Sequence, residues 1–215
     1  MMLKSSSSSS STTTTIICIR LLINLIFNGC VMAVVNGETV VDVWINAARW
    51  GGDAALDDMN SLFNDDMFAV DVLDESTHET ALQIASSSGR SRITKWLIER
   101  GADVDAAGGG GGSTPLMHAA RRGHTSIAKQ LLDANADALV KHKRSGWTAL
   151  HLAALRLDSD IVKMLVEYNV DTCSCRDKKN RTPLDLAVPK DGSDEVVEML
   201  SSFCSVLSSE DDSSL

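Results

Sequence analysis

Four threonines recur at steps of 34 residues, and this spacing constrains the fold more than any other feature of the chain. Thr80, Thr114, Thr148 and Thr182 each open a related word, namely TALQIA, TPLMHAA, TALHLAA and TPLDLA. Thirteen residues after the first three threonines come three further apolar words, ITKWLI, IAKQLL and IVKMLV. A fixed period of this length predicts a repeat architecture, in which each unit buries its apolar face against the next.

Each unit carries signals for where its two helices begin and end. Threonine supplies an N-cap oxygen, and Pro115 and Pro183 suit the first helical turn, where no amide donor is needed. Gly101, Asn135 and Asn169 stand at matching positions after the second helices. Because Gly and Asn tolerate the left-handed conformation that ends a helix, we predict a positive φ at all three.

Departures from the pattern identify irregular positions. Leu157-Asp158 replaces the Gly-His pair that an earlier unit places at Gly123-His124, so this turn is expected to be strained or rebuilt. The first unit lacks the threonine, and Asp42 is expected to cap its first helix. Five consecutive glycines, 108–112, predict a mobile loop.

The best-matching words are TPLMHAARRGH (114–124), TALHLAA (148–154) and ERGADVDA (99–106). In these words the chain resembles the ankyrin-repeat family over roughly residues 42–204. The resemblance implies an all-α solenoid of stacked helix–turn–helix units with hairpin or loop fingers. It also implies about five units with atypical ends, a monomer by itself, and a non-catalytic module that binds a protein partner as an adaptor, inhibitor or recruiting subunit.

The two ends of the chain differ from this repeat domain, which we place at residues 36–204. Residues 1–35 comprise a Ser/Thr tract followed by an apolar segment, 16–35, and two interpretations remain open. The segment is a signal or anchor, which gives a membrane-tethered or secreted protein, or translation starts at Met32 and residues 1–31 are not part of the mature protein. The odd number of cysteines, five, favours a reducing compartment, hence cytoplasm or nucleus. The tail 205–215 is acidic, is expected to be disordered, and ends in the PDZ-type pattern Ser213-Ser214-Leu215.

No residue pattern supports catalysis, a metal or a cofactor. His151 follows the capping threonine at the position where the family uses histidine to bond the cap, so a structural role is favoured over a catalytic one. Cys173-Ser174-Cys175 has no second cysteine pair at zinc-ligand spacing. We therefore expect no enzyme activity.

Charge indicates where a partner binds. The net charge of −9 argues against nucleic acid, and residues 36–79 carry eleven acidic residues and one arginine. By contrast, basic residues gather around one tryptophan at the positions that the family exposes on its concave face and finger tips. We predict that these bind an acidic protein surface; the alternative is that the cations solvate loops and that the tryptophan packs on the next finger. The predicted residues are Trp147, Arg121, Arg122, Lys141, Lys143, Arg144, Lys178, Lys179 and Arg181.

Overall fold

The structure, a computed structural model, describes residues 34–35, 38–51, 70–187 and 194–210. The chain divides into two compact units, residues 1–44 and 45–215. In the first unit, β1 (Val34–Val35) pairs antiparallel with β2 (Glu38–Thr39). Helix α2 (Val40–Trp50) follows and ends in the second unit. Because α2 begins at Val40, the expectation that Asp42 caps it is wrong.

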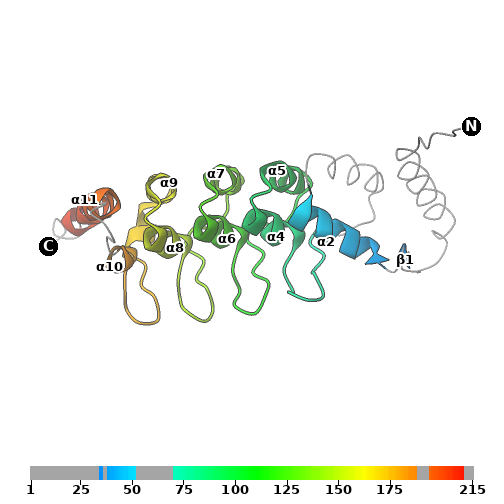
Figure 1. The fold of residues 1–215 in the computed structure, drawn as a ribbon. Coiled ribbons are helices and arrows are strands. Elements are labelled where there is room, and N and C mark those ends of the chain that lie inside the picture. The colour runs from blue at the N-terminus through cyan, green and yellow to red at the C-terminus, as the bar shows by residue number, and fades with distance from the viewer. Residues whose placement is uncertain (1–33, 36–37, 52–69, 188–193, 211–215) are drawn as a thin grey trace, which may run out of the picture. The chain divides into compact units, whose positions relative to one another are not determined.

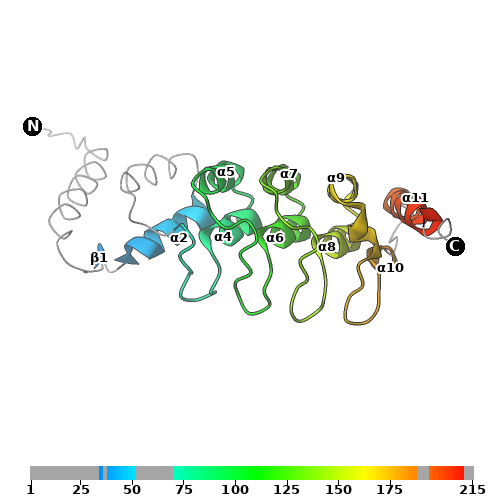
Figure 2. The ribbon, with the colours of Figure 1, turned by 180° about the vertical axis from the view of Figure 1, so that it is seen from behind.

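The second unit consists of inner and outer helices in alternation. The inner helices are α4 (Ala81–Ser88), α6 (Pro115–Arg122), α8 (Ala149–Arg156) and α10 (Pro183–Leu186). The outer helices are α5 (Ser91–Glu99), α7 (Thr125–Asp133), α9 (Ser159–Tyr168) and α11 (Asp194–Glu210). Each inner helix packs on the next inner helix and on the outer helix of its own unit (Figure 1; Figure 2). This arrangement confirms the predicted all-α repeat solenoid.

The threonines cap the inner helices as predicted. The Oγ1 atoms of Thr80, Thr114 and Thr182 each accept a hydrogen bond at 3.3 Å from the backbone amide three residues later. At Thr148 the cap is closed by His151, whose Nδ1 lies 2.9 Å from the threonine Oγ1 and accepts from the Thr148 amide at 3.2 Å. The local sequence thus fixes where each inner helix begins.

The turns between inner and outer helices are left-handed. Gly89 and Gly123 have φ values of 75° and 78°, and Leu157 at the equivalent position has φ of 59°. In this conformation the Cβ atom of a leucine lies too close to the following carbonyl oxygen, whereas glycine has no Cβ atom. The predicted strain at Leu157 is therefore confirmed. The next residue compensates in part, since Asp158 caps α9 by accepting from the Ile161 amide.

The ends of the outer helices are only partly as predicted. Gly101 and Asn135 have positive φ, 83° and 63°, but Asn169 has φ of −152° and ψ of 109°, so the prediction there is wrong. In the earlier units the next residue is an alanine that is buried beneath the turn. In this unit Val170 takes that position and is 37% exposed. The chain leaves α9 in extended form, and Asn169 caps the short 3-10 helix η1 (Val170–Ser174).

The core repeats with the same period as the sequence. Nine apolar side chains at 34-residue steps are at most 2% exposed, and they occupy one inner-helix position and two outer-helix positions in each of three successive units, α4–α5, α6–α7 and α8–α9. They are Leu82, Leu116 and Leu150; Ile93, Ile127 and Ile161; and Leu97, Leu131 and Leu165. Each unit therefore depends on its neighbours for burial of its apolar face.

The last unit is longer than the sequence indicated. Helix α11 continues to Glu210, so residues 205–210 are helical, and the predicted disordered tail does not begin at 205. Residues 52–69 of the predicted first unit and the segment 16–33 lie outside the described residues, so five units and the domain boundary at 35 stay predictions. Within the described ranges, none of the helices combines the length and hydropathy needed to cross a bilayer.

Candidate functional site: the fingers and the basic face

Four loops lead into the inner helices and project to one side of the helix rows (Figure 1). We call them fingers 1 to 4, residues 70–80, 103–114, 137–148 and 175–182. Backbone hydrogen bonds join each finger to the next: Gly109 N donates to His78 O at 2.7 Å, and Lys143 N donates to Gly111 O at 3.0 Å. Lys178 N donates to Ser145 O, also at 3.0 Å. The fingers therefore form one continuous layer.

The five glycines of finger 2 make room for finger 3. A Cβ atom at Gly111 would lie 2.1 Å from His142 Nε2, and one at Gly112 would lie 2.9 Å from the Lys143 side chain. At Gly110 the nearest atom is Arg144 Nη2, at 3.4 Å. The glycine run thus forms a surface without side chains, on which His142, Lys143 and Arg144 of finger 3 lie. The prediction of a mobile loop did not include this packing role.

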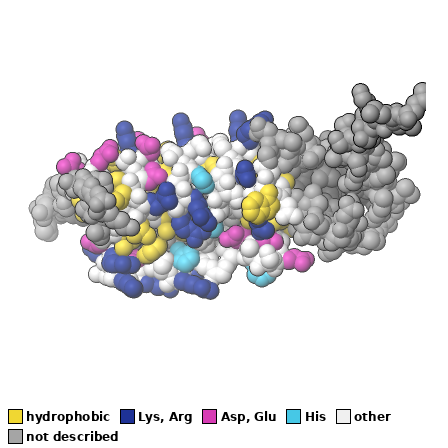
Figure 3. All heavy atoms as spheres, in the orientation of Figure 1, with side chains coloured by type: hydrophobic (Ala, Val, Ile, Leu, Met, Phe, Trp, Pro, Cys, Tyr) yellow, Lys and Arg dark blue, Asp and Glu magenta, His cyan; other side chains and the backbone are white. Residues whose placement is uncertain are grey.

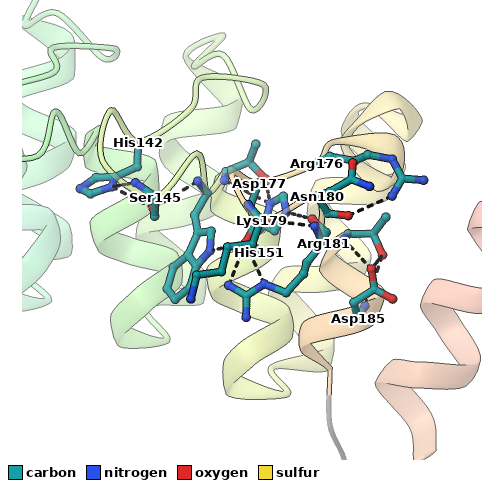
Figure 4. A network of polar contacts seen from close by, with 12 residues as sticks. His142, Ser145, His151, Arg176, Asp177, Lys179, Asn180, Arg181 and Asp185 are labelled. Carbon is teal, nitrogen blue, oxygen red and sulfur yellow. Dashed lines mark hydrogen bonds and ion pairs between the residues drawn. The ribbon is translucent and has the colours of Figure 1, made fainter.

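Asp177 organises the junction of fingers 3 and 4 (Figure 4). Its Oδ1 accepts from the amides of Lys179 and Arg181 at 2.8 and 2.9 Å. Its Oδ2 accepts from Trp147 Nε1 at 3.0 Å and from Arg181 Nε and Nη2 at 3.0 and 2.8 Å. Burial alone would raise the pKa of Asp177, but the hydrogen bonds from Arg181, Trp147 and Lys179 hold it well below its usual range.

Two of the nine predicted site residues therefore serve the scaffold. Trp147 is half-buried rather than exposed, and its indole N–H is used by Asp177. Arg181 forms an ion pair with the same carboxylate, and its backbone oxygen is 3.2 Å from His151 Nε2. The alternative interpretation of Trp147, that it packs on the next finger, is the one that these contacts favour.

The other seven predicted residues are exposed cations, and we call them the basic face. Within the described part of the chain, none of them forms an ion pair with a carboxylate. Figure 3 shows Lys and Arg side chains gathered over α6 and α8 and at the finger ends. The residues of the basic face are Arg121, Arg122, Lys141, Lys143, Arg144, Lys178 and Lys179.

Three separate elements bring these charges together. The pKa of His142 is lowered first by burial and then by the positive charges of Arg144, Arg121 and Lys178, which come from finger 3, α6 and finger 4. Lys178 also donates through Nζ to the backbone oxygen of Lys143, which holds its stem across finger 3. The basic face is therefore assembled by tertiary packing and does not coincide with a single run of basic residues.

A buried histidine lies beneath this face. His118 is 3% exposed; its Nδ1 is 3.0 Å from Arg121 Nη2, and its Nε2 is 3.5 Å from Glu79 Oε1. Burial, followed by the charges of Arg121, Arg122 and His142, lowers the pKa of His118 to about 4. The ring is thus neutral at neutral pH. Burial also raises the pKa of Glu79, although Arg121 opposes this shift.

The two inner-helix histidines, His118 and His151, have structural surroundings in the described part of the chain. The His118 ring is buried in the core. The His151 ring is fully buried, and its two nitrogens lie within hydrogen-bond distance of Thr148 Oγ1 and the Arg181 backbone oxygen, in the structural role expected for it. Among the described residues, no three His, Cys, Asp or Glu side chains are placed to hold a metal ion. The arrangement offers a layer of positive charge and backbone groups, which is suited to recognition.

A sequence model described as ankyrin repeats in three copies matches residues 30–142 and 116–208, which together cover most of the chain. The chain belongs to the ankyrin-repeat family. Ankyrin repeats are generally protein–protein interaction modules without catalytic activity. No curated protein shows significant similarity to the chain.

Sequence reasoning missed the residues that organise this ankyrin-repeat surface. The sequence pattern did not single out Asp177, although its side chain is only 1% exposed. His142 and Glu79 were likewise not assigned a role beneath the basic face. The available signal was the spacing of 30 residues from Trp147 to Asp177, close to one repeat, which places them on adjacent fingers.

Proposed function

We propose that this ankyrin-repeat chain is a recruiting or adaptor module that binds an acidic protein surface through the basic face. The observation that supports it most directly is the convergence of Arg121, Arg144 and Lys178 from three elements around His142, where none of the three forms an ion pair with a carboxylate of the described residues. Like charges brought together in this way raise the energy of the free protein. An acidic partner relieves that repulsion, so binding and charge neutralisation favour each other.

Trp147 and Arg181 have a positioning role in this proposal. Their shared contact with Asp177 fixes finger 4 against finger 3, and finger 4 carries Lys178 and Lys179. We expect Trp147→Phe to lower the melting temperature while leaving the affinity of the folded protein nearly unchanged. A large loss of affinity without loss of stability would instead make Trp147 a direct contact.

The test compares two charge reversals of equal size. The double variant Arg121→Glu, Arg144→Glu changes the basic face, and Lys129→Glu, Lys163→Glu changes the outer helices α7 and α9. All four side chains are exposed. Tagged wild type and both variants are incubated with native extract, and the captured proteins are identified by mass spectrometry.

We expect the basic-face variant to lose a set of acidic proteins that the outer-helix variant retains. For a purified partner, the association rate should fall with rising salt in the wild type and much less so in the basic-face variant. Capture of the same proteins by wild type and basic-face variant, at equal folded fractions, would rule out this surface as the binding site.

A further inference from the structure

A large apolar side chain is exposed beside the basic face. Leu155, in the last turn of α8, is 48% exposed, and Leu152, three residues earlier on the same side of the helix, is half-buried. Figure 3 shows hydrophobic side chains next to Lys and Arg side chains in this part of the molecule. Single exposed leucines are common on protein surfaces, so the surroundings of Leu155 decide whether it has a role.

The repeat pattern shows that the fold does not require an apolar residue at this position. The equivalent residues one and two repeats earlier are Arg121 in α6 and Ser87 in α4, and both are polar. These inner helices nevertheless pack on one another in the same way as α6 packs on α8. Leu155 is therefore not needed to fill the core, and α8 presents an apolar side chain where its neighbours present polar ones.

Positive charges flank Leu155 on the side of α6. Arg121 is next to Leu155 in the row of equivalent positions, because α6 and α8 pack side by side (Figure 1). The Arg156 guanidinium reaches towards α6, where its Nη1 donates to the backbone oxygen of Arg121 at 3.3 Å. Neither arginine forms an ion pair with a carboxylate of the described residues. An apolar contact and two positive charges thus lie together on adjacent inner helices.

We propose that Leu155 is an apolar anchor point at the edge of the basic face, and that the partner is a short extended segment in which one large apolar residue is accompanied by acidic residues about three positions away. This inference rests on the proposed binding of an acidic partner and specifies the chemistry of that partner. A carboxylate placed against Leu155 would lose water without gaining a hydrogen bond. An apolar side chain in the same place is removed from water together with Leu155.

The spacing of the helices sets the spacing of residues in the partner. The axes of packed helices are about 8–10 Å apart, and an extended chain advances about 3.3 Å per residue. A segment that crosses from α8 to α6 therefore covers this distance in about three residues. With its apolar residue on Leu155, such a segment brings its acidic residues to Arg121 and Arg156.

The probe is a fluorescein-labelled synthetic peptide of nine residues with a central leucine. Two glutamates stand three and four positions away on each side, so that either chain direction is served, and the remaining positions are serine. One matched peptide has serine in place of the leucine, and another has glutamine in place of every glutamate. Binding to the full chain is measured by fluorescence anisotropy at low and at physiological salt.

The two matched peptides separate the apolar contact from the charges. We expect the peptide without leucine to bind about five- to tenfold more weakly than the probe at both salt concentrations, because burial of apolar surface is not screened by salt. The peptide without glutamates should lose most of its affinity at low salt and show little further dependence on salt.

Matched variants of the protein test the same contact from the other side. Leu155→Gln removes the apolar group but keeps a long side chain with good helix propensity, and Leu155→Met keeps an apolar group. Tyr168→Gln is the control, because Tyr168 is 45% exposed on the outer helix α9. Circular dichroism confirms equal folding. We expect Leu155→Gln to weaken binding of the probe about five- to tenfold without affecting the peptide that lacks leucine, and the other two variants to stay within about twofold of the wild type.

The inference is overturned if the peptides with and without leucine bind equally, if Leu155→Gln binds the probe as the wild type does, or if no peptide binds at millimolar concentration. The charge variant Arg121→Glu, Arg144→Glu distinguishes this failure from failure of the proposed function. Loss of binding in the charge variant but not in Leu155→Gln supports the acidic partner and overturns the anchor. Loss in Leu155→Gln but not in the charge variant supports the anchor and overturns the acidic partner.

Discussion

The substitution Gly101→Val measures the cost of the left-handed turn that ends an outer helix. Gly101 has φ of +83°, and a Cβ atom added there meets nothing within 4 Å. The cost is therefore backbone strain without a steric clash, about 1–2 kcal/mol for a non-glycine residue. At about 2–4 °C per kcal/mol for a protein of this size, the melting temperature should fall by roughly 2–8 °C.

Asn169 provides the matched control, because the sequence places it at the equivalent position. Its φ of −152° is extended backbone that valine adopts readily, so Asn169→Val should lose only the side-chain bond to the Asp171 amide, about 1 kcal/mol. Asn169→Ala loses the same bond and should be equally stable. Stability is read from urea unfolding followed by circular dichroism with a shared m-value. The reasoning fails if Gly101→Val unfolds like the wild type, or if Asn169→Val is clearly less stable than Asn169→Ala.

Three further predictions concern stability. The pKa of His118 is about 4 in the folded protein against an ordinary 6.5, so its contribution is complete above pH 6.5 and is lost as the pH falls through this window towards 4. Between pH 6.5 and 5 the wild type should lose about 1 kcal/mol per pH unit more than His118→Gln, and equal slopes in urea titrations would contradict this. Leu116→Ala should cost about 2–5 kcal/mol, because Leu116 is fully buried, whereas the half-exposed Leu155→Ala should cost under about 0.5 kcal/mol; similar values would refute the packing. A chain beginning at Met32 should match the full chain in helical signal and melting, and a loss of cooperativity would show that residues 1–31 contribute to folding.

The sequence by itself determined the repeat and its local conformations. The threonine caps, the left-handed turns at Gly89 and Gly123, and the pairing of Thr148 with His151 all involve residues within four positions of one another. Such features follow from side-chain chemistry and the allowed φ values of each residue type, so they can be read without knowing what packs nearby. The 34-residue core positions follow from the same pattern.

Only the tertiary structure decided which residues of the candidate site face solvent. Trp and Arg are residue types that often contribute to binding sites. In this protein, however, Asp177 accepts hydrogen bonds from both Trp147 and Arg181. Likewise, Asn169 has a negative φ, although Gly101 and Asn135 at the equivalent sequence positions have positive φ. These outcomes depend on contacts between groups that the local pattern does not link, where burial and hydrogen bonding by a neighbouring segment outweigh the preference of any single residue.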